Sequence, residues 1–213
     1  MQDTPDAKSV RGRLIAAFLR SLRDEPFSKI KITELCRRAH IARASFYTHF
    51  SSLDELADAA IDDAFSVVCD VSAEDYERML RRLGPIVESG DLKAFAALPL
   101  EALPPVHRMA ATPAHRALLA DDELFMRIEK RMNEWESKRF LVLLMKRAAL
   151  PREEAEAMVH FVVTAVLSLN RRIGWDNSDK WAAAQLCAMR FVKAGVAALV
   201  LRRAQPPQDC PRD

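Results

Sequence analysis

The sequence lacks the features of membrane, secreted and metal-binding proteins. No stretch of the chain approaches the roughly 18 uninterrupted apolar residues of a membrane-spanning helix. The opening run Met-Gln-Asp-Thr-Pro-Asp-Ala-Lys has no apolar core, so we expect no signal peptide. The cysteines at positions 36, 69, 187 and 210 form no Cys-x-x-Cys motif, which argues against a zinc site and a disulfide framework. These absences favour a cytoplasmic protein without a bound metal.

Enzyme motifs are absent as well. The sequence contains no Gly-x-Ser-x-Gly, no P-loop and no His-Glu-x-x-His. His107 and His115 stand eight residues apart in a proline-broken stretch, which is a weak pattern for a metal site. Asp121, Asp122 and Glu123 could bind a cation, but acidic residues at the start of a helix are better explained by the helix dipole. We therefore predict no catalytic activity and no cofactor.

Glycine is scarce, with 5 in 213 residues, while half of the residues are hydrophobic and 29% are charged. This is the composition of an ordinary soluble chain with one or two domains and a sizeable core. Apolar residues recur at three- and four-residue spacing along most of the chain, which predicts an all-α fold. Prolines break the stretch between residues 99 and 113. The longer helices are expected over residues 9–24, 73–87, 121–148 and 179–203.

Charge is unevenly distributed along the chain. In total, 32 Lys and Arg against 30 Asp and Glu give a net charge of +2. Residues 8–49, however, contain ten basic and three acidic residues, a net of +7, so the remainder carries −5. A basic N-terminal unit on a mildly acidic body is typical of a protein that meets nucleic acid at one end. A solvated helical surface that happens to be basic is the plainer alternative.

Residues 32–50 have the pattern of two short helices joined by a tight turn. Leu35, Cys36 and Ala39 form one apolar face, and Phe46 and Phe50 form an i, i+4 pair on a second helix that starts near residue 42 or 43. The polar side of this second helix carries Arg, Ser, Tyr, Thr and His, types that hydrogen-bond phosphate oxygens and base edges. A short helix held at an angle by a partner helix is the helix-turn-helix, which fits the major groove.

The run 46–50, Phe-Tyr-Thr-His-Phe, followed by 51–56, Ser-Ser-Leu-Asp-Glu-Leu, resembles the DNA-binding signature of the TetR/AcrR family of bacterial transcriptional regulators. The resemblance covers about residues 9–65 at motif level. It implies an all-α homodimer with an N-terminal helix-turn-helix domain and a helical ligand-binding and dimerisation domain. We place the DNA-binding domain at 1–56, the second domain at 57–204 and a disordered tail at 205–213.

Four positions depart from the family pattern. His40 stands where the family has its turn glycine, and Ala42 stands where a Ser or Thr commonly caps the second helix. Leu53 replaces a lysine that touches phosphate in many relatives, so that role is not carried over. Lys31 stands at the helix-opening threonine. The changes leave the predicted fold intact and bear on the operator sequence.

The resemblance implies that the second helix lies in the major groove of double-stranded DNA. Tyr47 and His49 match phosphate-contacting positions of the family, and Arg43 and Ser45 fall where relatives more often touch bases. Lys31 and Thr33, at the start of the preceding helix, are expected to lie next to phosphates. The predicted DNA-binding residues are Lys31, Thr33, Arg43, Ala44, Ser45, Tyr47, Thr48 and His49.

The body supplies many large apolar side chains and few polar ones. Aromatic and Met residues at helical spacing more often form core than pocket. Their number, the proline-broken segment and the family resemblance nevertheless favour a mostly apolar pocket for a small-molecule effector. The predicted ligand-binding residues are Phe95, Met109, Phe125, Trp135, Phe140, Met145, His160 and Phe161.

The helix expected after Pro151 has a wide apolar face, and the final helix, over 179–203, carries apolar residues on two sides. A helix apolar on two sides usually packs on two sides. One side would pack on the body of its own chain and the other on a second subunit, in a four-helix interface. The alternative is that both sides are internal core. The predicted interface residues are Val159, Val163, Val166, Ala184, Ala188, Phe191, Gly195 and Ala198.

These patterns together predict a homodimeric regulator, more often a repressor in this family, that binds an inverted-repeat operator and is released by a small, mostly apolar ligand. The alternative from another class is a helical dimer whose basic head binds an acidic protein partner. DNA affinity that falls steeply with salt, while a preference for one sequence survives, would separate the two.

Overall fold

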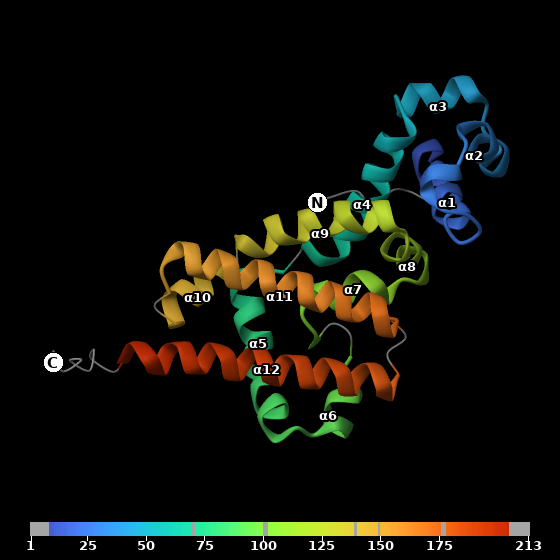
Figure 1. Ribbon diagram of the computed structural model, residues 1–213. Coiled ribbons are helices and arrows are strands. Elements are labelled where there is room, and N and C mark those ends of the chain that lie inside the picture. The colour runs from blue at the N-terminus through green and yellow to red at the C-terminus, as the bar shows by residue number, and fades with distance from the viewer. Residues whose placement is uncertain are drawn as a thin grey trace, which may run out of the picture. The chain divides into compact units, whose positions relative to one another are not determined.

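The computed structural model describes residues 9–204 except 70, 100, 101, 139, 149, 176 and 177. Every regular element in that part of the chain is a helix, which confirms the predicted all-α class (Figure 1). Residues 1–8 and the predicted disordered tail at 205–213 lie outside the described residues. The N-terminal elements are α1 (Val10–Ser21), η1 (Phe27–Lys29), α2 (Ile32–Ala39), α3 (Arg43–His49) and α4 (Leu53–Cys69). The others are α5 (Ala73–Ser89), α6 (Leu92–Ala96), α7 (Pro105–Arg108), η3 (Met109–Ala111), α8 (Pro113–Ala120), α9 (Asp122–Ser137), α10 (Phe140–Ala148), α11 (Arg152–Ile173) and α12 (Asp179–Ala204).

The chain divides into two compact units. The first comprises Met1–Tyr76 and Pro99–Lys130, and the second comprises Glu77–Leu98 and Arg131–Asp213. Helices α5 and α9 therefore each begin in the first unit and end in the second. The first unit is larger than the predicted DNA-binding domain, because α4 and α8 pack on α1, and α7 and η3 pack on α4. The functional boundary after residue 56 stays a prediction.

The helix-turn-helix is held by a small aromatic and aliphatic core. Helix α1 packs on α2, α3 and α4, and Ser9 caps it by accepting a hydrogen bond from the Gly12 N–H at 3.0 Å. Phe18 of α1 is fully buried and meets Phe27 of η1 edge to face, with ring centroids 5.9 Å apart. Burial of such side chains is the main force that orders a domain of this size. The amphipathic stripe predicted for the first helix is therefore its contact face.

Helix α4 begins at a Ser-x-x-Glu motif formed by Ser52 and Glu55. The Glu55 N–H donates to Ser52 Oγ at 3.1 Å, as a capping box requires. The Glu55 carboxylate differs from that pattern, because it accepts from the N–H and the hydroxyl of Ser51, both at 2.7 Å, instead of from Ser52. These hydrogen bonds lower the pKa of Glu55 below its ordinary value.

The predicted bounds of two helices differ from those in the structure. The helix expected over 121–148 is two helices, α9 and α10, which separate after Ser137. The Lys138 N–H donates to the Trp135 carbonyl at 3.3 Å, a tight i, i−3 bond that closes α9 although no Pro or Gly stands there. The helix expected over 9–24 ends at Ser21, because the N–H groups of residues 23 and 24 also form i, i−3 bonds.

Helices α11 and α12 run antiparallel as a hairpin in the second unit (Figure 1). A buried polar cluster fixes their register. The Asn170 side chain accepts from Trp181 Nε1 at 2.7 Å and from Gln185 Nε2 at 3.0 Å, and donates to the Val166 carbonyl at 2.7 Å. Because these polar groups satisfy one another away from water, a shifted pairing of the two helices would leave them unsatisfied.

Candidate nucleic-acid interface

The turn between α2 and α3 uses a histidine in the left-handed conformation. His40 has φ 53° and ψ 49°, the backbone region in which glycine is favoured. The His40 N–H donates to the Arg37 carbonyl at 3.2 Å and the Ile41 N–H donates to the Cys36 carbonyl at 2.9 Å. The second bond closes α2 in the manner of a Schellman motif. The expectation that His40 takes a turn conformation without glycine's freedom is confirmed.

Two phenylalanines anchor α3 and leave its polar face outward. Phe46 and Phe50 are buried, with ring centroids 5.9 Å apart. Ala42 precedes the helix with extended backbone and supplies no side-chain cap, as its residue type predicts. Cys36 is buried in α2, where the lack of solvent raises the pKa of its thiol, so it belongs to the core as predicted.

The predicted DNA-binding residues lie on the outer surface of α3 and at the start of α2. Ser45 is half-buried. The seven exposed members are Lys31, Thr33, Arg43, Ala44, Tyr47, Thr48 and His49. Exposed side chains on one short helix, held from behind by buried aromatics, have the arrangement that major-groove recognition requires.

Arg43 and Tyr47 form a pair on the exposed face of α3. Arg43 Nη2 donates to the Tyr47 hydroxyl at 3.4 Å, and the guanidinium lies 5.8 Å from the centre of the tyrosine ring. This hydrogen bond raises the pKa of Arg43 above its usual value. Thr48 is turned back, since its hydroxyl donates to the Ala44 carbonyl at 3.2 Å. It would have to leave that bond to donate to a phosphate oxygen.

The positive charge of α2 is partly neutralised within the helix. Glu34 binds Arg37 Nη2 at 2.6 Å and Arg38 Nε at 3.1 Å, and these two arginines lower the pKa of Glu34 to about 2. Arg38 also binds Asp24 at 2.7 Å. The i, i+3 and i, i+4 spacing of Arg37 and Arg38 from Glu34 is visible in the sequence, but the prediction of a basic surface did not use it. Lys31 and Arg43 are therefore stronger candidates for DNA contact than Arg37 or Arg38.

The predicted ligand-binding residues are divided between the two units. Met109 and Phe125 belong to the first unit, where both are buried. In the second unit, Phe95 is buried, Trp135 and Phe140 are half-buried, and Met145, His160 and Phe161 are exposed. Nothing in the described structure brings all eight together.

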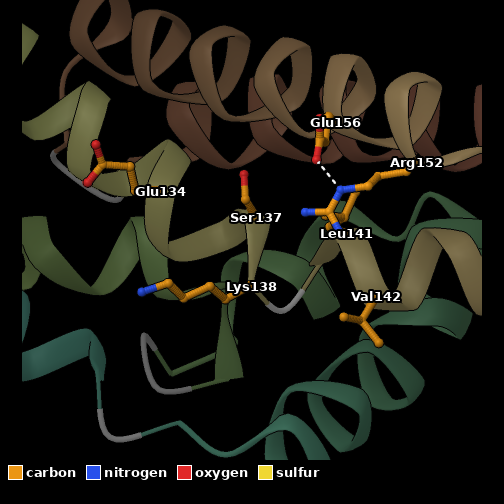
Figure 2. A pocket seen from close by; sticks show the side chains of 7 residues that line it. All are labelled: Glu134, Ser137, Lys138, Leu141, Val142, Arg152 and Glu156. Carbon is orange, nitrogen blue, oxygen red and sulfur yellow. Dashed lines mark hydrogen bonds and ion pairs between the residues drawn. The ribbon is translucent and has the colours of Figure 1, made fainter.

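A surface hollow of about 650 Å³ lies in the second unit at the end of α9, along α10 and at the start of α11 (Figure 2). None of the eight predicted residues lines it. Arg152 and Glu156, which border it, form an ion pair at 2.8 Å. Its lining is Glu134, Ser137, Lys138, Leu141, Val142, Arg152 and Glu156. The hollow therefore does not test the predicted apolar pocket, which stays a prediction.

The predicted dimer residues fall into two groups. Val159 and Val163 of α11 are buried within their own chain, and Val166, Ala184 and Ala188 are half-buried. The remaining three, Phe191, Gly195 and Ala198 of α12, are exposed. Residues Asp179–Leu199 form a helical segment that is long and apolar enough to span a membrane by length and composition alone, with a mean hydropathy of 1.3. Only 17% of this segment is buried. Helix α12 thus presents an unusually apolar exposed face.

Comparisons with known proteins agree with this geometry at the N-terminus. The model of the bacterial regulatory proteins of the TetR family matches residues 14–60, which contain most of α1 and all of α2 and α3. An uncharacterised HTH-type transcriptional regulator of Haemophilus influenzae is 40% identical over 57 residues, which are 27% of this chain and 28% of that protein. The matched region thus spans under a third of the relative's length.

One solved structure matches along most of the chain. It is the TetR family repressor AlkX from Dietzia sp. strain DQ12-45-1b, implicated in biodegradation of n-alkanes. It is 16% identical, the match covers 90% of this chain and 96% of that one, and the TM-score is 0.37. A likeness at this score gives no information about the ligand of the body.

Proposed function

We propose that this chain, whose residues 14–60 match the TetR family of bacterial regulatory proteins, is a DNA-binding transcriptional repressor that binds an inverted-repeat operator as a homodimer. The observation that carries the proposal is the exposed face of α3. Arg43, Tyr47 and His49 point away from a core formed by Phe46 and Phe50. In a dimer, two such helices would enter successive major grooves on one side of the duplex.

The exposed face of α12 supports the proposed homodimer. Phe191 is 68% exposed in the isolated chain, and Gly195 and Ala198 lie beside it at helical spacing. Small residues allow close approach of a second helix, and a large aromatic provides an anchor. Because Val159 and Val163 are already buried, α11 would contribute its exposed Phe161 in their place.

Release by a small, mostly apolar ligand completes the proposal. The ligand needs only to bind the DNA-free arrangement of the two heads more tightly than the DNA-bound one. Such a protein acts in the cytoplasm, where the chromosome lies, and its partners are the operator, the effector and its own second copy. None of these roles requires catalysis.

The test is a selection of random double-stranded DNA on the purified full-length protein, sequenced after several rounds. We expect an enriched inverted repeat whose half-sites are about one helical turn apart. Affinity for it should fall steeply with salt while the sequence preference survives. Salt-sensitive binding without any enriched sequence would contradict the operator role and would favour a basic head that binds an acidic protein partner.

A further inference from the structure

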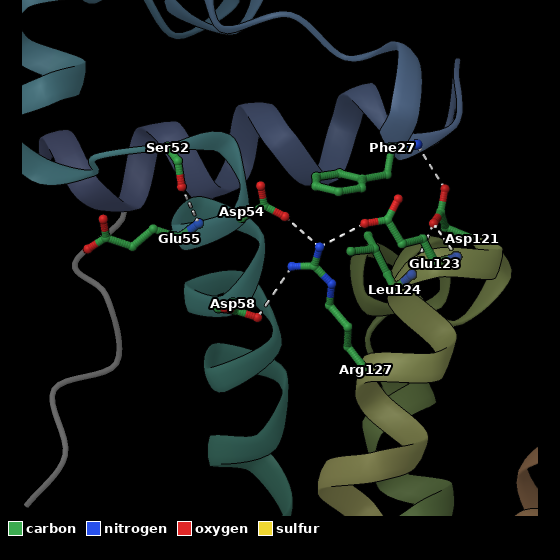
Figure 3. A network of polar contacts seen from close by, with 9 residues as sticks. All are labelled: Phe27, Ser52, Asp54, Glu55, Asp58, Asp121, Glu123, Leu124 and Arg127. Atoms are coloured by element: carbon green, nitrogen blue, oxygen red, sulfur yellow. Dashed lines mark hydrogen bonds and ion pairs between the residues drawn. The ribbon is translucent and has the colours of Figure 1, made fainter.

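One aspartate caps the start of α9 and also binds the segment that precedes the helix-turn-helix (Figure 3). Asp121 Oδ1 accepts from the N–H groups of Glu123 and Leu124, each at 3.1 Å, and so caps α9. Its other oxygen, Oδ2, accepts from the Phe27 N–H at 2.8 Å, across 94 residues of sequence. The carboxylate thus ties the start of α9 to η1, which leads into α2.

Arg127, six residues after Asp121, contacts α4, a carboxylate of its own helix and the ring of Phe27. Its Nη2 binds Asp54 of α4 at 2.5 Å and Glu123 of its own helix at 2.7 Å, and its Nη1 lies 3.6 Å from Asp58. Its guanidinium also lies 5.3 Å from the centre of the Phe27 ring. Asp54 and Asp58, four residues apart on one face of α4, would repel each other without this cation.

The Arg127 contacts are not ordinary surface pairs. Its side chain is 27% exposed, so solvent screens it less than it screens a fully exposed arginine. Burial lowers its pKa, but the bonds to Asp54 and Glu123 outweigh that effect and raise it overall. One guanidinium therefore holds α4, α9 and η1 at a single point.

We propose that Asp121 and Arg127 are positioning residues that lock the orientation of the helix-turn-helix, together with the start of α4 that follows it, relative to α9. Phe27 lies just before α2 and Asp54 lies just after α3, so the two contacts hold both ends of the DNA-reading pair. A rotation of the head would have to break both. In a dimer, the lock fixes the distance between the two α3 helices; this consequence rests on the proposed function.

The lock also gives α9 a regulatory position. The helix continues without a break from Asp122 in the first compact unit to Ser137 in the second. A displacement of α9 along its axis would act on the Phe27 and Asp54 contacts together. The head would then be free to take other orientations, at other half-site spacings.

The first test compares full-length wild type with Arg127→Gln on the selected operator and on operators whose half-sites are one base pair closer or further apart, a shift of about 3.4 Å. Arg152→Gln is the matched control, because it breaks an exposed ion pair on α11 at 2.8 Å. We expect wild type and Arg152→Gln to prefer one spacing. The preference of Arg127→Gln should be weaker by about fivefold or more, the low end of coupling between sites.

Affinity for a single half-site should stay at the wild-type value in Arg127→Gln, because none of the predicted DNA-binding residues is replaced. Arg127→Lys, which keeps the charge beside the three carboxylates, should restore most of the spacing preference. An Arg127→Gln protein with wild-type half-site affinity and wild-type spacing preference would overturn the lock.

A second measurement needs no operator, so it decides the lock even if the proposed function fails. Hydrogen exchange of peptides that contain the Phe27 amide is followed in the DNA-free protein. Arg127→Gln leaves the Phe27–Asp121 bond chemically intact, yet it should speed exchange of that amide if the two contacts act as a unit. Exchange equal to that of wild type would overturn the lock, whereas absence of an operator for wild type would overturn only the repressor proposal.

Discussion

The Arg43 guanidinium lies over the ring of Tyr47, one turn further along α3, and donates a 3.4 Å hydrogen bond to its hydroxyl. The two side chains therefore orient each other on the face predicted to meet DNA. Tyr47 is 48% exposed, so the contact restrains a surface side chain. Arginine aimed in this way can present both of its terminal nitrogens to one guanine edge.

Replacing Tyr47 and Arg43 one at a time should show which residue contributes DNA affinity in general and which contributes base preference. Tyr47→Ala should weaken binding to all sequences, because it removes a predicted phosphate contact and leaves Arg43 unrestrained. Arg43→Ala should also weaken binding, and it should relax base preference at one operator position by about 1–3 kcal/mol. The measurement is titration of both variants against every single-base variant of the operator. Equal discrimination by wild type and Arg43→Ala would rule out base reading by Arg43.

Release of the neutralised arginines should strengthen non-specific DNA binding. Glu34→Gln removes the carboxylate that pairs with Arg37 and Arg38 on α2. Since the pKa of Glu34 is about 2, wild type keeps that charge at every pH at which DNA binding is measured. The slope of log affinity against log salt should steepen by roughly 0.9 for each phosphate newly neutralised.

The matched control for that variant is Glu77→Gln. It removes the carboxylate of the exposed Arg81–Glu77 pair at 3.3 Å, on α5. The two substitutions change the net charge equally, so a difference between their salt slopes must come from the position of the removed carboxylate, on α2 or on α5. Identical slopes for the two variants would contradict a DNA-facing role for α2.

Local patterns in the sequence accounted for most of the helix-turn-helix. The apolar i, i+4 pair of Phe46 and Phe50, the core position of Cys36 and the missing cap at Ala42 all depend on residues a few positions apart. Such contacts are encoded by helical periodicity and by residue type. The turn at His40 follows from the family resemblance, which has a turn glycine at this position.

Long-range polar contacts had no comparable signal. Asp121 and Arg127 lie on a helix whose charged residues are typical of a solvated face, and their partners Phe27 and Asp54 are 94 and 73 residues away. The end of α9 at Ser137 also had no signal, because no Pro or Gly marks it. Tertiary packing decides these features, and helix propensity does not encode it.

Protonation of His115 should destabilise the folded chain in mild acid. His115 of α8 is 5% exposed, and its Nε2 lies 3.5 Å from Asp63 Oδ2 of α4. Burial lowers its pKa below the ordinary 6.5, against the opposing pull of the Asp63 carboxylate. Just below pH 6.5 the unfolded chain therefore binds more protons than the folded one. The free energy of unfolding should fall as pH drops through that window.

Urea unfolding at several pH values measures this effect. One proton contributes at most about 1.4 kcal/mol per pH unit. His115→Gln should reduce the slope between pH 6.5 and the lowered pKa, whereas His49→Gln, at an exposed position on α3, should leave it unchanged. A slope that is the same in wild type and His115→Gln would show that other groups are responsible.

A charge in the middle of the exposed α12 face should disrupt the proposed dimer. Phe191→Glu places a carboxylate where the second subunit would bury an aromatic ring, at a cost to association of roughly tenfold or more. Met126→Glu is the control, since Met126 of α9 is 67% exposed, nearly the same as Phe191 at 68%. Sedimentation equilibrium of the DNA-free proteins gives the dimer dissociation constants. If Phe191→Glu dimerises as tightly as Met126→Glu, the interface lies elsewhere.

A hydroxyl at position 42 should stabilise the recognition helix. Ala42 has φ −65° and ψ 143°, the extended geometry of a capping residue, but it has no oxygen to accept the free N–H groups of the first turn of α3. Ala42→Thr supplies that oxygen, and Ala42→Val has the same shape without it. We expect the threonine variant to unfold at higher urea, with a free energy of unfolding about 1 kcal/mol above that of the valine variant. Equal stability of the two would mean that water already satisfies these N–H groups, and that the missing cap costs the helix nothing.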